Sequence, residues 1–179
     1  MIQLCYDAYS IAYFAVSYEM GSRTMMDFLE DLFVREQSFL HPSYKGNKKR
    51  FLSDVLYWTD YLIDQEQLNR EFPVIEKDFE ASGMQFDWGH YAAEYRGIDL
   101  YFMIMRLRIL YLGTQEYVRI KLRTLLKHYG YRRRSQAIVA HIQTCLDYYH
   151  IQPHLKGGRR CDISEIKLDD MITFRLKWI

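Results

Sequence analysis

Hydrophobic residues recur at helical spacing over most of the chain. Residues 24–39 and 50–71 each carry an apolar stripe with polar and acidic residues on the other side, as amphipathic helices do. Residues 2–18 and 100–112 are apolar almost all round, a pattern that suits a buried helix or buried strands equally well. Alanine in the first run and Met and Leu in the second favour helix. We therefore expect a helical region over residues 1–112.

The pattern changes after residue 112. Residues 114–129 and 135–150 carry two further helical stripes, and Gly130 stands where the first of these helices would end. Ser135 is a suitable N-cap for the second helix. Residues 166–168 and 172–176 alternate between apolar and polar positions, which predicts a hairpin of two strands around Asp169-Asp170. The fold class is therefore expected to be mainly α (α+β), with a small β-hairpin in the region 113–179.

Charge separates the same two regions. The chain has a net charge of only +1, but residues 1–103 hold 9 Lys and Arg against 17 Asp and Glu (−8), whereas residues 104–179 hold 15 against 6 (+9). A basic half of this kind indicates nucleic-acid binding. The alternative is that the two halves neutralise each other across an internal or oligomeric interface. Within the basic half, positive charge is densest between Tyr129 and Ser135 and at the predicted tight turn of residues 156–160.

Cysteine usage and hydropathy point to a cytoplasmic protein that does not enter a membrane. The three cysteines are odd in number and form no CxxC pair, which is typical of a reducing compartment. No cationic leader precedes the first apolar run, and the longest apolar run, residues 100–112, contains two arginines and is too short to span a bilayer.

The order helix, basic turn, helix, basic hairpin over residues 113–179 resembles the winged helix-turn-helix superfamily. The resemblance implies that the second helix enters the major groove of DNA, where Ser135, Gln136 and Gln143 would read base edges. Phosphate contacts would come from the turn and from a helical ridge, and further contacts from the hairpin turn. The residues assigned to phosphate, ridge and hairpin contacts are Arg132, Arg133, Arg134, Arg119, Arg123, Lys127, Lys156, Arg159 and Arg160. The sequence thus predicts a non-enzymatic binder of double-stranded DNA, as a regulator or as the accessory subunit of a larger DNA-acting complex.

Two other functions remain open. Winged helices also serve as protein-interaction adaptors, as in the accessory subunits of SMC-type complexes, and the acidic, Tyr-rich region 1–112 could hold a protein partner or form a homodimer. The segment Arg123-Thr124-Leu125-Leu126-Lys127-His128 resembles the signature of HEPN-type ribonucleases, in which the Arg holds the phosphate and the His acts in cleavage. Thr124 departs from that signature, where a stronger polar residue is usual.

Metal and nuclease motifs are weaker. Cys145, His150, His154 and Cys161 are all legitimate zinc ligands, but their spacing lacks a CxxC knuckle and Cys145 adjoins the buried stripe. The segment Glu165-Ile166-Lys167 has the acid-x-Lys form that restriction-type nucleases use, without a preceding Asp of known geometry. We therefore expect no catalytic residue, no metal and no cofactor.

Overall fold

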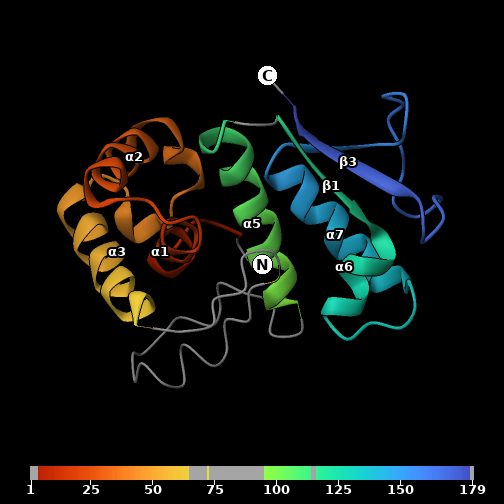
Figure 1. Cartoon of the computed structure of the whole chain (residues 1–179), viewed down its shortest axis with the longest axis horizontal. Helices are drawn as coiled ribbons and strands as arrows, with labels where there is room; N and C mark the ends of the chain where they lie inside the picture. The colour runs from red at the N-terminus through yellow and green to blue at the C-terminus, as the bar shows by residue number, and fades with distance from the viewer. Residues whose placement is uncertain (1–3, 65–71, 73–94, 114–115, 178–179) are drawn as a thin grey trace. The chain divides into compact units, whose positions relative to one another are not determined.

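The computed structural model describes residues 4–64, 72, 95–113 and 116–177. The chain divides into two compact units, residues 1–96 and 97–179 (Figure 1). Helices dominate and a small antiparallel sheet completes the structure, which confirms the predicted fold class. In the described ranges, every helix is too short or too polar to cross a bilayer.

The first unit is helical. Its central helix α1 is buried on nearly every side and packs against α3, because a helix that is apolar all round finds no favourable place at a surface. The rings of Trp58 and Tyr9 meet at nearly right angles, with their centroids 5.2 Å apart. The predicted helices are confirmed in outline, although residues 65–71 lie outside the described part of the chain. The elements of this unit are α1 (Ala8–Ser17), α2 (Ser22–Arg35), the 3-10 turns η1 (Gln37–Phe39) and η2 (Pro42–Tyr44), and α3 (Lys48–Ile63).

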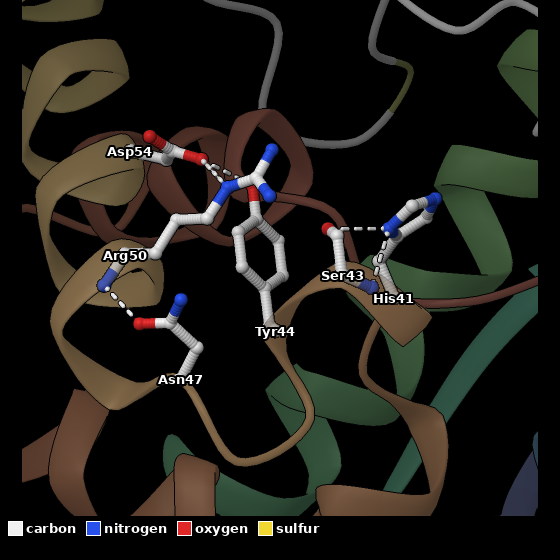
Figure 2. Close-up of polar contacts among 6 residues, drawn as sticks. All are labelled: His41, Ser43, Tyr44, Asn47, Arg50 and Asp54. Carbon is white, nitrogen blue, oxygen red and sulfur yellow. Dashed lines mark hydrogen bonds and ion pairs between the residues drawn. The ribbon is translucent and has the colours of Figure 1, made fainter.

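Polar side chains fix the start of α3, as Figure 2 shows. The side-chain oxygen of Asn47 accepts a hydrogen bond from the backbone N–H of Arg50 at 3.1 Å, which caps the helix. The Tyr44 hydroxyl donates to Oδ2 of Asp54 at 3.0 Å, and Arg50 Nε lies 3.7 Å from the same oxygen. Burial raises the pKa of Tyr44, and Asp54 acts in the same direction, so this hydroxyl stays a donor. The short connection between η2 and α3 is thus held from both ends.

The second unit combines helices with a three-stranded sheet. Both strand pairs are antiparallel and the strand order is β1-β3-β2, so the last strand in sequence is the central one. Thr173 at the middle of β3 faces Arg119 on one side and His154 on the other. Val118 and Phe174 lie on the buried face of this sheet. The elements are α5 (Arg96–Tyr111), β1 (Tyr117–Lys121), α6 (Leu122–His128), α7 (Gln136–Tyr148), β2 (Ile151–His154) and β3 (Met171–Leu176).

Helix α5 belongs to this second unit, whereas the sequence placed the boundary after residue 112. The predicted helix over 100–112 is confirmed, and its contacts explain the grouping. The Phe102 ring meets the Phe174 ring of β3 edge-on at 5.8 Å. Arg106, although charged, is buried, and its Nη1 donates to the backbone carbonyl of Tyr149 at 2.7 Å. The all-round apolar surface of α5 is therefore the core of the C-terminal unit.

Two predicted elements are wrong. The helix expected over 114–129 is a strand, β1, followed by the short helix α6, because Val118 and Ile120 alternate with the outward Arg119 and Lys121 at the period of two that a strand requires. The hairpin expected around Asp169-Asp170 is also absent: residues 166–168 form no strand, and β3 pairs with β1 and β2. The predicted helical ridge of Arg119, Arg123 and Lys127 therefore does not exist.

Candidate nucleic-acid interface

The turn between α6 and α7 is closed by local hydrogen bonds. Gly130 adopts φ +81°, a left-handed conformation that suits glycine after the end of a helix. The backbone N–H of Tyr131 then returns to the carbonyl of Leu126 at 2.9 Å. At the other end, Ser135 Oγ accepts from the backbone N–H of Ile138 at 3.3 Å, which confirms Ser135 as the N-cap of α7. The sequence pattern thus placed the turn and the start of α7 correctly.

The exposed face of the N-terminal half of α7 consists of small and amide-bearing side chains. Gln136, Ala137 and Ala140 are exposed, and the two alanines leave the backbone close to the surface. Gln143 is half-buried, and its amide group donates to Oδ1 of Asp147 at 2.9 Å. Gln136 is therefore the more available of the two glutamines that the sequence assigned to base reading.

The three consecutive arginines of the turn have different environments. Arg132 and Arg133 are exposed, and their side chains form no hydrogen bond or ion pair with any residue that the structure describes. Arg134 is half-buried, and its Nη1 donates to the carbonyl of Ile163 at 3.1 Å and to the carbonyl of Ile166. Arg134 thus attaches the β2–β3 loop (residues 155–170) to the turn, and its phosphate contact stays a prediction.

Arg123 holds the same loop at a second point. Its Nε and Nη2 donate to the two carboxylate oxygens of Asp169 at 2.7 and 2.9 Å, and both side chains are more than half exposed. These hydrogen bonds hold the pKa of Asp169 below its usual value. Lys127 and Arg132 lie with Arg123 around a hollow of about 600 Å³. The other residues that line this hollow are Leu126, Gly130, Tyr131 and Leu168.

The β2–β3 loop divides into a basic tip and an acidic remainder. Gly157 and Gly158 both have positive φ, at 88° and 82°, and Leu155 N–H donates to the carbonyl of Arg159 at 2.9 Å, so the predicted tight turn is confirmed. Every residue from Lys156 to Arg160 is exposed. The following residues carry four acids against one lysine: Asp162, Glu165, Lys167, Asp169 and Asp170. The tip of this loop therefore carries a net positive charge, whereas the rest of the loop is net negative.

A further basic surface on the outer face of the sheet was missed from the sequence. The guanidinium groups of Arg119 and Arg175 lie 4.7 and 5.1 Å from the centre of the Tyr117 ring. Arg119 Nε also donates to Oγ1 of Thr173 at 3.2 Å. Arg119, Thr173 and Arg175 line a hollow of about 280 Å³ that extends to the basic tip at Lys156. The alternation in Tyr117-Val118-Arg119-Ile120-Lys121 is the signal that could have revealed this strand face.

The structure does not gather the residues of the ribonuclease motif or of the zinc motif into one compact group. Arg123 and His128 are five residues apart on α6, so they project about 140° apart around the helix. No three of the four candidate zinc ligands bring their ligand atoms together, although all four lie in the described part of the chain. Cys145 is fully buried, and burial together with Asp99 raises the pKa of its thiol well above the usual value. The residues that the structure does bring together are the cations of the α6–α7 turn and the loop that Arg123 and Arg134 attach to it.

No family model matches this sequence, and no curated protein and no solved structure matches the chain. The function is therefore inferred from this chain's own residues.

Proposed function

We propose that residues 97–179 form a winged-helix module that binds double-stranded DNA without catalysing a reaction. The observation that carries the proposal is the order of elements after α5. Helices α6 and α7 are joined by a turn with two available arginines, and they are followed by an antiparallel β2–β3 hairpin with a basic tip. The strand before the helix pair, β1, completes the sheet by pairing with β3. A helix pair and a basic hairpin in this order suit a winged helix.

In this proposal the N-terminal end of α7 enters the major groove. Ala137 and Ala140 allow the helix backbone a close approach to base edges, and the amide of Gln136 supplies hydrogen bonds. Arg132 and Arg133 contact phosphates beside the groove. Arg123 and Arg134 have a different role, because they hold the β2–β3 loop in place. The remaining phosphate contacts come from Lys127, Lys156, Arg159 and Arg160.

These six cations set the expected salt dependence. Each neutralised phosphate of B-DNA contributes about −0.9 to the slope of log K against log salt, so six contacts predict a slope of about −5. Limited base reading by α7 gives only modest discrimination among sequences. Binding to a random duplex is therefore the appropriate first measurement.

The test is a fluorescence-anisotropy titration of a labelled random duplex at low and physiological salt. We expect salt-sensitive binding by the full chain, and a shallower salt slope with much weaker binding in the Arg132→Glu/Arg133→Glu variant. A matched control is Lys45→Glu/Lys49→Glu, which changes the net charge equally at two exposed residues of the first unit. Absence of binding at low salt, or equal weakening in both variants, would contradict the proposal.

A protein-interaction adaptor is the second candidate, and the surface of the first unit favours it. Ile63 is 62% exposed and Val34 is 73% exposed, and Leu56 and Tyr57 of α3 are also exposed. Leu56 and Ile63 are seven residues apart, so they share one face of the helix. Apolar side chains gathered on one helix face indicate a docking surface. Its simplest form is a homodimer through the first unit.

Size-exclusion chromatography coupled to light scattering measures the molar mass in solution and so tests for the homodimer. We expect a dimer that dissociates in the Leu56→Asp/Ile63→Asp variant, whereas Asp27→Asn, at an exposed position of α2, should leave the dimer intact. A chain that remains monomeric at high concentration would remove the homodimer from consideration.

A further inference from the structure

Three side chains with metal-binding groups meet inside the second unit. Asp99 lies in the first turn of α5, and His141 and Cys145 lie one turn apart on the same face of α7. Cys145 Sγ is 3.5 Å from Oδ1 of Asp99 and 3.7 Å from Nε2 of His141, and Nε2 is hydrogen-bonded to the same Asp99 oxygen. The three ligand atoms all lie within 4.8 Å of one another. The cluster combines a carboxylate, an imidazole and a thiol from two helices.

The buried carboxylate of Asp99 is only partly satisfied by the protein's own donors. Asp99 is completely buried, and its Oδ2 has no hydrogen-bond partner in the described part of the chain. A buried carboxylate oxygen without a donor is costly, and such atoms are usually satisfied by a proton donor or a cation. The neighbouring groups that face Asp99 are His141 and Cys145, and both of them direct their polar atoms to the other oxygen.

We propose that Asp99, His141 and Cys145 bind a divalent transition-metal ion of the zinc class. Cysteine sulfur, histidine nitrogen and carboxylate oxygen are together the ligand types that Zn²⁺ takes. Mg²⁺ and Ca²⁺ prefer oxygen ligands throughout and do not suit this donor set.

The distances fit a tetrahedral ion with little movement. Bonds of about 2.0–2.3 Å at tetrahedral angles place neighbouring ligand atoms roughly 3.3–3.8 Å apart. The two separations that involve Cys145 Sγ, 3.5 and 3.7 Å, already fall in this range. Only His141 and Asp99 must move apart, because the ion takes the place of the hydrogen bond between them.

Three protein ligands leave a fourth position for water or another small ligand. The side chain of His141 is 14% exposed, whereas Asp99 is sealed, so the ion would enter from the His141 side. Binding releases the thiol proton of Cys145 to solvent and joins α5 to α7 through the ion. None of the three ligands is a proposed DNA contact, so the metal site and the DNA interface can be tested separately.

Cobalt titration of the reduced, metal-free full chain tests the site directly. We expect one equivalent of Co²⁺ to produce thiolate-to-cobalt charge-transfer absorption and the visible bands of a tetrahedral ion. The charge-transfer absorption should disappear in Cys145→Ser and remain in the matched control Cys161→Ser, which removes a half-buried thiol of the same unit. Absence of the charge-transfer band in the wild-type chain, or its loss in Cys161→Ser, would overturn the proposal.

A second measurement covers variants that fold poorly. Asp99→Asn keeps the shape and hydrogen-bonding capacity of the cluster but removes the carboxylate. Zn²⁺ should raise the Tm of the wild-type chain by several degrees, because it binds the folded state, and should leave the Tm of Asp99→Asn unchanged. Equal Zn²⁺ responses in the two chains would show that the cluster is a hydrogen-bonded structural contact and that the metal binds elsewhere.

Discussion

Replacement of Arg134 should destabilise the second unit, although two neighbouring arginines can be replaced without this effect. Arg134 Nη1 donates to the carbonyls of Ile163 and Ile166, the points at which the β2–β3 loop returns to the helices. Arg132 and Arg133 have the same charge and stand next to it in sequence, but both are exposed. The three positions therefore separate a structural arginine from surface arginines within a single turn.

The structure supplies the size of the effect. A hydrogen bond from a charged donor contributes about 1.5–3 kcal/mol, and the half-buried position of Arg134 favours the lower end for each of its two bonds. Arg134→Ala should therefore lower the free energy of unfolding by about 2–4 kcal/mol. Arg134→Lys keeps the charge but cannot reproduce the fork of the guanidinium group, so its effect should be about half as large. Arg133→Ala, an exposed substitution, should stay within about 0.5 kcal/mol.

Scanning calorimetry of the full chain measures the difference. A change of 1 kcal/mol shifts Tm by roughly 4–8 °C in a domain of this size, so Arg134→Ala should lower the transition of the second unit by about 10 °C or more. Arg133→Ala is the matched control for loss of one charge. If Arg134→Ala and Arg133→Ala had the same Tm, the two carbonyl contacts would contribute nothing to stability. The assignment of Arg134 to the β2–β3 loop would then be wrong.

Three further predictions concern the same unit. Gly97→Ala should destabilise this unit, because a Cβ there would lie 2.3 Å from Cε1 of Tyr129. Alanine has the better helix propensity, so without this clash the substitution would stabilise the helix. A gain in stability in urea denaturation would contradict this packing. The pKa of Asp169 is lowered by Arg123, so this contribution to stability is present above the unfolded pKa and is lost as pH falls through the folded pKa. In Arg123→Ala, a carboxyl NMR titration should show the pKa of Asp169 rising toward the ordinary value of an aspartate side chain, and an unchanged value would refute the ion pair. Ser135→Ala should lower the free energy of unfolding by about 1 kcal/mol through loss of the α7 cap, which urea denaturation can measure against Ser164→Ala in the loop.

The sequence predicted best where a local pattern and a local signal agreed. Helix α7 has an apolar stripe and a Ser135 cap, and both are local properties that tertiary packing did not alter. Residues 100–112 were assigned to a helix by composition, and α5 confirms it. What the sequence could not show is that α5 packs with β3, because a helix that is apolar all round has no pattern to indicate which elements surround it.

The errors come from residues that satisfy two patterns at once. Val118 fits the helical stripe of Leu122 and Leu125 as well as the strand alternation with Ile120, and the pairing of β1 with β3 decided between them. The candidate site has the same limitation. An arginine that binds a backbone carbonyl is identical in sequence to one that is exposed, so the split between Arg134 and Arg132 depended on the three-dimensional position of the loop.

The position of β3 also determines when the second unit can be completed during synthesis. In the described sheet β1 and β2 do not pair with each other, and both pair with β3, although β2 also forms an isolated bridge to Arg160. While the ribosome is translating the segment before Met171, both earlier strands are without the neighbour that will satisfy their backbone groups. Such late, long-range pairing slows folding and leaves strand edges open to wrong partners. A released chain truncated before Met171 should therefore be sensitive to protease across β1 and β2, whereas the full chain should be protected there.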